Sequence, residues 1–246
     1  MNIVMAYHRP TSIDEACNLI AAGAVILAGG TKLNRNTNPY DGPPIPRDLV
    51  DIQSLGLDQI STDGTKSATI GACVTIQQVV DDDRLPPVVR DAARREAPRT
   101  IRNAATIGGT AGAAEPQSEL LAALLAYGAT IRTESATGAN EFDLSQVLVE
   151  GADYGLITEV TIETTGVAVA ERVGRTPSDN PIVAVVGRQV DGVLTLGIAG
   201  IATVPVLADP SLVDELEPPG DFRGSPEYRR HLATVLTNRV IKELSQ

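Results

Sequence analysis

The chain has 246 residues, enough for one large domain or two ordinary ones with a substantial core. Its 31 acidic and 20 basic side chains give a formal net charge of −11, which argues against nucleic acid or an anionic membrane as a partner. Hydrophobic residues make up 43% of the chain but aromatic residues only 3%, so we expect packed α and β layers with an aliphatic core.

The two cysteines, Cys17 and Cys73, are too few for a disulfide scaffold and lack the four-thiolate spacing of an iron–sulfur cluster. The N-terminus has no signal-peptide pattern, and no segment reaches the ~20 apolar residues that a membrane span needs. We therefore expect a soluble, cytoplasmic protein without a transmembrane segment.

The first part of the chain contains a helix that Thr11 or Ser12 can cap, followed by a short buried strand from Ala24 to Leu27. This strand leads directly into the glycine loop Ala28–Thr31. A polar, proline-rich stretch follows, and Leu49–Ile52 is predicted as another strand. We place the first boundary near residue 55.

The second part is predicted to mix strands with helices around a second glycine loop, Thr106–Gly109. Its helices are expected to begin at Thr75, Pro86 and Glu119. The helix from Glu119 to Ala126 is rich in leucine and alanine. The strands are expected at Ser67–Gly71, Ala129–Glu134 and Leu156–Thr164.

Two charged clusters in this part have an ordinary and a functional interpretation. The acidic triplet Asp81–Asp83 is more consistent with a solvated turn than with a metal site. Basic side chains on or after the helix from Pro86 could attract phosphate, although like charges along a helix are more often simply solvated. These basic residues are Arg90, Arg94, Arg95, Arg99 and Arg102.

The last part, from about residue 167, contains the clearest hairpin signal. Two apolar runs, Ile182–Val190 and Val193–Ala202, are joined by Asp191-Gly192. The stretch Pro205–Gly224 is rich in proline and glycine and is predicted to be an irregular connector. Ser225-Pro226 then opens a C-terminal helix.

Glycine loops such as these allow backbone N–H groups to approach a ligand oxygen, and phosphate is the usual ligand. The dinucleotide fingerprint G-x-G-x-x-G is absent, and Gly30-Thr31-Lys32 does not match the end of a phosphate-binding P-loop. A single glycine pair after a strand is most often a turn. Two such loops in one chain favour a phosphate clamp.

Several collinear segments resemble the FAD-binding medium subunits of molybdenum hydroxylases, the carbon monoxide dehydrogenase and xanthine dehydrogenase FAD-subunit family. The similarity extends from Tyr7–Ser12 at the start to Ser225–Leu232 at the end. Between these ends it is carried by Leu27–Leu33, Ile70–Ala72, Ile101–Asn103, Thr106–Gly109 and Glu115–Glu119.

This resemblance implies an α+β fold: a two-subdomain FAD-binding fold of the PCMH, or vanillyl-alcohol-oxidase-like, type plus a small C-terminal α+β domain. The FAD-binding subdomains would span residues 1–55 and 56–166, with the cofactor between them. Residues 167–246 would form the C-terminal domain, shortened because Pro205–Gly224 replaces a helix of the family.

The resemblance also assigns cofactor-binding residues. Backbone groups of the two glycine loops would hold the FAD pyrophosphate, Thr110, Ala113 and Glu119 would contact the ribityl or adenosine portion, and Leu156 or Ile157 would touch the flavin ring. Glu119 has an equal alternative as a carboxylate in the first turn of a helix. Arg172 falls where relatives often have lysine. The loop residues are Ala28, Gly29, Gly30, Thr31, Lys32, Leu33, Thr106, Ile107, Gly108 and Gly109.

By the same resemblance, the chain is an electron-transfer subunit of an oxidoreductase and contributes neither a catalytic residue nor a metal site. A large subunit would hold molybdopterin, a small subunit would hold two [2Fe–2S] clusters, and the FAD would pass electrons to an acceptor such as a quinone or NAD. The expected assembly is a dimer of heterotrimers. The two histidines, His8 and His231, lack a cysteine or carboxylate partner at ligand spacing, and surface or capping roles suit them better.

Some segments depart from the family pattern. Asn34–Asn38 is polar where relatives have an aliphatic segment with proline, and the aromatic segment near residues 142–151 is reduced to Phe142 and Gly151. Two alternatives therefore stand beside the main interpretation. One is a flavin-poor structural or assembly subunit of the same complex, and the other is a free-standing FAD oxidase.

Overall fold

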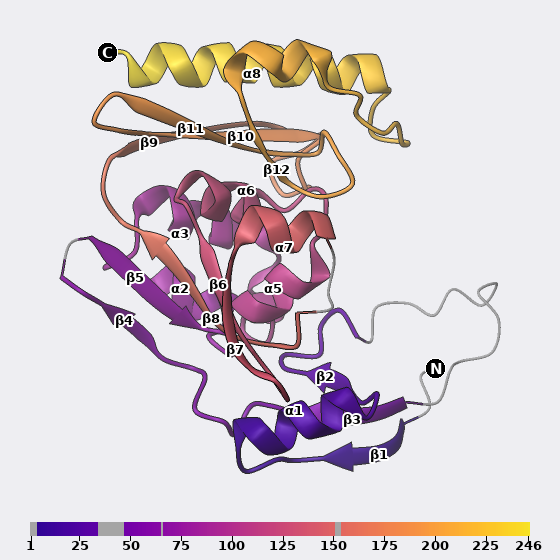
Figure 1. Ribbon diagram of the computed structural model, residues 1–246. Coiled ribbons are helices and arrows are strands. Elements are labelled where there is room, and N and C mark those ends of the chain that lie inside the picture. Colours follow the sequence, from indigo (N-terminus) through magenta and orange to yellow (C-terminus); the bar gives the residue numbers. More distant parts are fainter. Residues whose placement is uncertain (1–3, 34–46, 65, 151–153) are drawn as a thin grey trace.

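The computed structural model describes residues 4–33, 47–64, 66–150 and 154–246. Its strands form three separate sheets, of three, five and four strands, with helices between and beside them (Figure 1). The fold is α+β, as the resemblance implied. Asn34–Asn38 and Gly151, where the sequence departs from the family pattern, lie outside the described residues. Among the described residues, no helix combines the length and apolar character required to cross a bilayer.

The N-terminal sheet is parallel, with β3 between β1 and β2. Ser12 caps α1 by accepting from the backbone N–H of Glu15, which confirms the predicted helix start. Residues of α1 and β3 share a small core with Cys73 and Leu156 of the second sheet region. The elements of this sheet are β1 (Val4–His8), α1 (Ile13–Ala21), β2 (Val25–Leu27) and β3 (Arg47–Asp51).

The five-stranded sheet is antiparallel, in the order β4-β5-β8-β6-β7. Strand β5 matches its predicted bounds, whereas β7 has no counterpart in the prediction because five of its six residues are exposed and its sequence is polar. The strands are β4 (Ile60–Thr62), β5 (Ser67–Gly71), β6 (Thr130–Ser135), β7 (Gly138–Asp143) and β8 (Leu156–Glu163).

Six helices lie in the described residues of this middle part of the chain. Helix α6 is apolar on every side and all of its residues are buried, as expected for a helix surrounded by other elements. It contacts α3 on one side and the four-stranded sheet on the other. The helices are α2 (Ile76–Asp81), α3 (Pro87–Glu96), α4 (Arg99–Arg102), α5 (Ile107–Ala113), α6 (Glu119–Ala126) and α7 (Leu144–Glu150).

One helix contradicts the prediction of a second glycine loop. The second glycine loop is the first turn of α5, with Thr106 as its N-cap. Glycine has a low helix propensity, so the sequence favoured a loop. The helix forms because Ile107 is buried in the core and Gly108 packs directly against Ala72.

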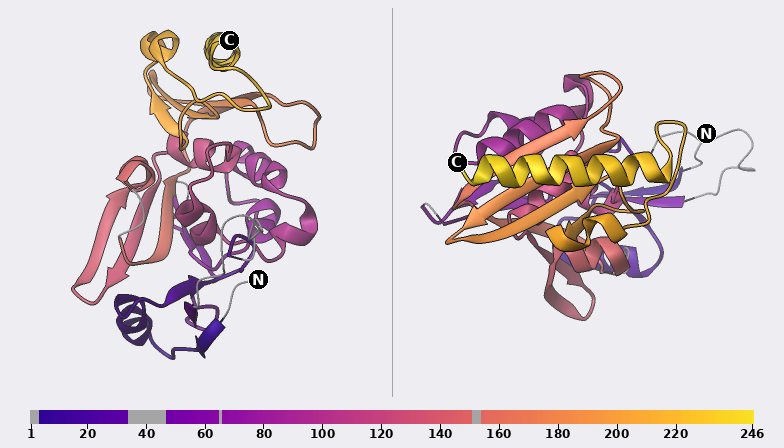
Figure 2. Two further views of the ribbon diagram at one scale, coloured as in Figure 1. Left: turned by 90° about the vertical axis from the view of Figure 1, so that its right-hand side faces the viewer. Right: turned by 90° about the horizontal axis from the view of Figure 1, so that it is seen from above.

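The C-terminal sheet has the order β12-β11-β10-β9, and its β10–β11 hairpin turns at Asp191-Gly192 as predicted. Helix α8 runs across its outer face, opposite α6 (Figure 2). The stretch predicted as an irregular connector contains β12 and the short 3₁₀ helix η1, a correction to that prediction. These elements are β9 (Val167–Val173), β10 (Val183–Val190), β11 (Val193–Ala199), β12 (Val206–Ala208), η1 (Pro210–Glu215) and α8 (Pro226–Leu244).

Candidate cofactor-binding site

A cavity of about 460 Å³ lies between the loop after β2, the helix α5 and the start of β8. This volume is within the range of small-molecule and cofactor sites. Most of the residues predicted to bind the cofactor line it: Ala28, Gly29, Gly30, Thr31, Lys32, Leu33, Thr106, Gly108, Gly109, Thr110, Ala113 and Ile157. The fold therefore brings together residues that are far apart in the sequence.

The first glycine loop forms one edge of this cavity. Gly29 has no room for a side chain, because a Cβ there would lie 1.7 Å from the carbonyl oxygen of Ala104. Gly30 adopts a φ of +69°, a conformation that favours glycine. Within the described part of the chain, the backbone N–H groups of Gly29, Gly30, Thr31 and Lys32 donate to no partner. Four consecutive free donors at a cavity edge suit an anionic ligand.

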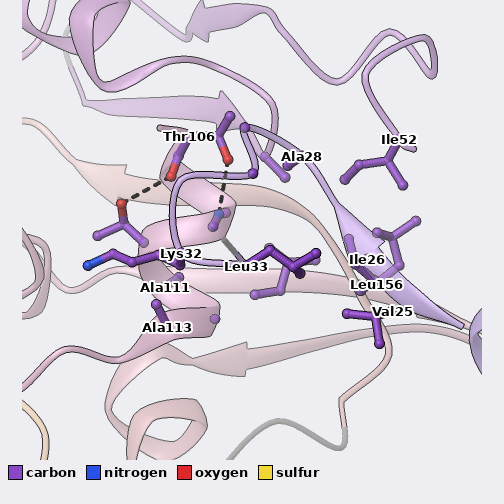
Figure 3. Close-up of a pocket in the computed structure, with 18 of the residues that line it drawn as sticks. Val25, Ile26, Ala28, Lys32, Leu33, Ile52, Thr106, Ala111, Ala113 and Leu156 are labelled. Carbon is purple, nitrogen blue, oxygen red and sulfur yellow. Dashed lines mark hydrogen bonds between the residues drawn. The ribbon is translucent and has the colours of Figure 1, made fainter. Parts of the chain in front are cut away.

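The side chain of Lys32 forms an ion pair at the edge of the cavity. Its Nζ lies 3.2 Å from Oε1 of Glu115, which precedes α6, and both side chains are more than one-third exposed. Figure 3 shows Lys32 beside Ala111 and Ala113 of α5. An ion pair with this exposure contributes at most about 1 kcal/mol, and it joins the end of the first glycine loop to the opposite side of the cavity.

The first turn of α5 differs from the first loop in its hydrogen bonding. The N–H groups of Ile107 and Gly108 donate to the carbonyls of Val74 and Ala72, at 2.9 and 3.0 Å. The N–H groups of Gly109 and Thr110 donate to the side chain and carbonyl of Thr106. Because all four donors are bonded inside the chain, the predicted clamp of two donor loops is reduced to one donor loop facing a helix.

Gly108 of α5 allows the helix to pack closely against a neighbouring segment. A Cβ on Gly108 would lie 2.7 Å from the Cβ of Ala72, so only glycine allows the helix to approach the segment after β5 this closely. The small side chains of Ala111 and Ala113 then face the cavity (Figure 3). Helix α5 therefore contributes space rather than hydrogen-bond donors.

The wall opposite α5 is apolar. Val25, Ile26, Ile52 and Leu156 gather there, from β2, the end of β3 and the start of β8 (Figure 3). Such a wall is suited to a flat, weakly polar ring system. Leu156 is one of the two residues that the resemblance placed against a flavin ring, and the other, Ile157, also lines the cavity.

Tyr154 is an aromatic residue of the lining that sequence reasoning missed. Its ring packs against Phe142 with centroids 4.6 Å apart and a tilt of 58°. Its hydroxyl donates to Glu150 Oε2 at 2.6 Å, and this hydrogen bond raises the pKa of Tyr154 to about 12. The retained Phe142 of the reduced aromatic segment thus supports the ring of Tyr154 at the cavity.

Three predicted residues lie outside the cavity lining. Ile107 is fully buried in the main core. Glu119 and Arg172 are paired with each other, with 3.1 Å between Glu119 Oε2 and Arg172 Nε, and Glu119 Oε1 lies 3.1 Å from Arg95 Nε. Burial raises the pKa of the Glu119 carboxyl, against the opposing influence of Arg95 and Arg172. This first-turn carboxylate of α6 connects α3 and β9.

The other charged clusters have local partners. Arg102 donates to the carbonyls of Arg94 and Ala97, and Arg95 pairs with Glu119. Asp82, in the acidic triplet, accepts from Arg84. Among the described residues, no group of three or more histidine, cysteine, aspartate or glutamate side chains is arranged to hold a metal ion.

Comparison with known proteins identifies the family. Residues 3–162 match the model for the FAD binding domain in molybdopterin dehydrogenase, and residues 202–244 match the CO dehydrogenase flavoprotein C-terminal domain. The chain is 26% identical to the carbon monoxide dehydrogenase medium chain of Afipia carboxidovorans, with 96% of this chain and 95% of the relative covered. It is 25% identical to the xanthine dehydrogenase FAD-binding subunit of Escherichia coli O157:H7, over 97% and 95%.

A solved structure has the same fold. The carbon monoxide dehydrogenase from Hydrogenophaga pseudoflava that lacks the Mo-pyranopterin moiety superposes with a TM-score of 0.86 at 21% identity, covering 98% of this chain and 97% of that one. The family-model match covers more than half of the chain and includes both sides of the cavity. The chain therefore belongs to the family of FAD-binding subunits of molybdenum hydroxylases, with an FAD-binding domain at residues 3–162.

Proposed function

We propose that this chain is the FAD-binding electron-transfer subunit of a heteromeric molybdenum-containing dehydrogenase. The observation that carries the proposal is the row of free N–H donors at Gly29–Lys32, placed at the edge of a cavity with an apolar wall. FAD suits such a combination, because its pyrophosphate is anionic and the dimethylbenzene end of its flavin ring is apolar.

Within this proposal, the N–H groups of Gly29–Lys32 hold the pyrophosphate. The small residues of α5, including Gly109 and Ala113, leave room for the chain of the cofactor. Leu156 and Ile157, which line the cavity, would contact the flavin ring and help to exclude water from it. Ile107, Glu119 and Arg172 support the site from outside, because none of them lines the cavity.

When bound, FAD would supply the redox chemistry that links the [2Fe–2S] clusters of a partner subunit to an acceptor such as a quinone or NAD. The contribution of this chain is to bind the cofactor and tune its surroundings. A molybdopterin-binding large subunit completes the proposed assembly, a dimer of heterotrimers. The names of the dehydrogenase relatives support this partnership.

The proposal includes the division of the chain at residues 55 and 166. Each proposed part holds one complete sheet, with strands at residues 4–51, 60–163 and 167–208. We further propose a reducing, cytoplasmic location, which agrees with two cysteines that are both buried and unpaired.

The proposal is tested by purifying the chain together with the products of neighbouring genes and denaturing the preparation. We expect release of about one FAD per copy of this chain, together with molybdopterin and iron from the other subunits. A colourless preparation that takes up no added FAD would instead identify an assembly subunit. FAD in a chain that turns over a substrate without partners would identify an oxidase.

A further inference from the structure

The first glycine loop is held in place by a side chain that the sequence did not single out. Gln53, two residues beyond β3, donates from Nε2 to the carbonyl oxygen of Ala28 at 2.7 Å. The parallel pairing of β2 with β3 brings the two residues together, and it continues past the strands through the bond from Ile52 N to Leu27 O.

Gln53 is itself positioned by a buried carboxylate. Its backbone N–H donates to Asp51 Oδ1 at 3.0 Å, and Asp51 is only 5% exposed. Asp51 also accepts a hydrogen bond from the hydroxyl of Tyr7 on β1. A chain of contacts therefore leads from the edge strand β1, through Asp51 and Gln53, to the first peptide of the glycine loop.

The contact sets the direction in which a cofactor-facing donor points. The Ala28–Gly29 peptide is trans, so its carbonyl and its N–H lie on opposite sides of the chain. The carbonyl faces Gln53, which lines a second, more polar cavity of about 340 Å³ that Gly29 also lines. The N–H of Gly29 is thereby directed away from Gln53.

We infer that Gln53 is a positioning residue that holds the Ala28–Gly29 peptide with its N–H toward the main cavity before the cofactor arrives. The inference rests on the proposed function, because it assumes that the FAD pyrophosphate occupies that side of the loop. Without Gln53, the Ala28 carbonyl loses this hydrogen bond and the direction of the Gly29 N–H is held less firmly.

The test compares Gln53→Met, which keeps the length of the side chain and removes the donor, with Gln59→Met. Gln59 is a matched control, because it is also exposed and its amide donates only to the neighbouring Asp58 side chain. Both variants of the full chain are stripped of cofactor and titrated with FAD and with riboflavin, which lacks the phosphates. NMR order parameters of the backbone N–H groups of residues 28–32 are measured in the cofactor-free protein.

We expect Gln53→Met to weaken FAD binding by about threefold to tenfold, the size of one hydrogen bond, with riboflavin binding unchanged and lower backbone order parameters at residues 28–32. Gln59→Met should match the wild type in all three measurements. Unchanged FAD affinity in Gln53→Met would overturn the inference and leave the proposed function standing. Equal losses for FAD and riboflavin would also overturn it, because they indicate a general structural defect. A wild-type chain that binds no FAD would overturn the proposed function as well.

Discussion

Gly29 has two constraints at once: it carries one of the free donors, and its α-carbon faces the carbonyl of Ala104. A Cβ at 1.7 Å from that oxygen cannot be accommodated unless the backbone of either segment moves. Substitution at this position therefore affects the folded protein even without cofactor. The glycine is required for the approach of two segments as well as for the ligand.

We expect Gly29→Ala to lower the free energy of unfolding of the cofactor-free chain by about 1–3 kcal/mol, the usual range for forced overpacking. Gly112→Ala is the matched control, because Gly112 lies in α5 and a Cβ there meets nothing within 4 Å. Alanine at this helical position should be neutral or stabilising by up to about 1 kcal/mol. Urea denaturation measures both, and equal stability of the two variants would contradict the packing account.

At the residue scale, the sequence predicted the first glycine loop well because strand-to-loop glycines have a local signature. It could not predict the contact between Gln53 and Ala28, which depends on the pairing of two strands separated by a long connection. Glu119 was open to two interpretations. The structure places it in a buried ion pair with Arg172, and nothing near either residue in the sequence indicated that pairing.

At the scale of elements, α5 is the clearest departure from expectation. Three of its seven residues are glycine, which disfavours a helix by local propensity. Thr106 caps the helix locally, and tertiary contacts decide the outcome, because the carbonyls of Ala72 and Val74 accept its first donors. The acceptors lie more than 30 residues earlier in the chain, so a local pattern carries no information about them.

The contact between α3 and α6 makes the stability of the fold depend on pH. Glu96, the last residue of α3, accepts a hydrogen bond from Ser118 Oγ at 2.9 Å at the start of α6. Burial raises the pKa of the Glu96 carboxyl, Glu119 adds to this effect, and Ser118 and Lys32 oppose it. A carboxyl with a higher pKa in the folded than in the unfolded protein stabilises the fold in its protonated form, and this stabilisation is lost as the pH rises through the folded pKa.

We therefore expect Glu96→Gln to be at least as stable as the wild type at pH 7, with an advantage that shrinks as the pH falls toward 5. Glu227→Gln is the control of opposite sign. Backbone hydrogen bonding at the start of α8 lowers the pKa of Glu227, so its charge stabilises the fold at neutral pH. Urea denaturation at both pH values measures the differences. An advantage of Glu96→Gln that grows on acidification would contradict the burial of this carboxyl.

At the scale of the whole molecule, the buried helix α6 connects the middle part of the chain to the C-terminal sheet. A Cβ on Gly197 of β11 would lie 2.0 Å from the carbonyl oxygen of Ala122, so the sheet rests directly on the helix backbone. The Glu119–Arg172 pair joins the same two layers through β9. The cavity therefore lies in a part of the fold that is tied to the C-terminal sheet through α6.

The sequence predicted those elements whose own residues form a recognisable local pattern. The β10–β11 hairpin has an Asp-Gly turn, α6 has an unbroken apolar run, and α8 begins with a Ser-Pro cap. Elements without such signals were missed, such as the polar strand β7 and the short strand β12. These form because a neighbouring strand is available to pair with them.

The central claim is that one donor loop, Gly29–Lys32, binds the FAD pyrophosphate at the edge of the apolar cavity. A crystal structure of the chain with FAD tests it most directly. We expect pyrophosphate oxygens within about 2.7–3.2 Å of the N–H groups of this loop. The flavin ring should lie against Leu156 or Ile157. A pyrophosphate bound elsewhere, or these four N–H groups left without contact to the cofactor, would contradict the account.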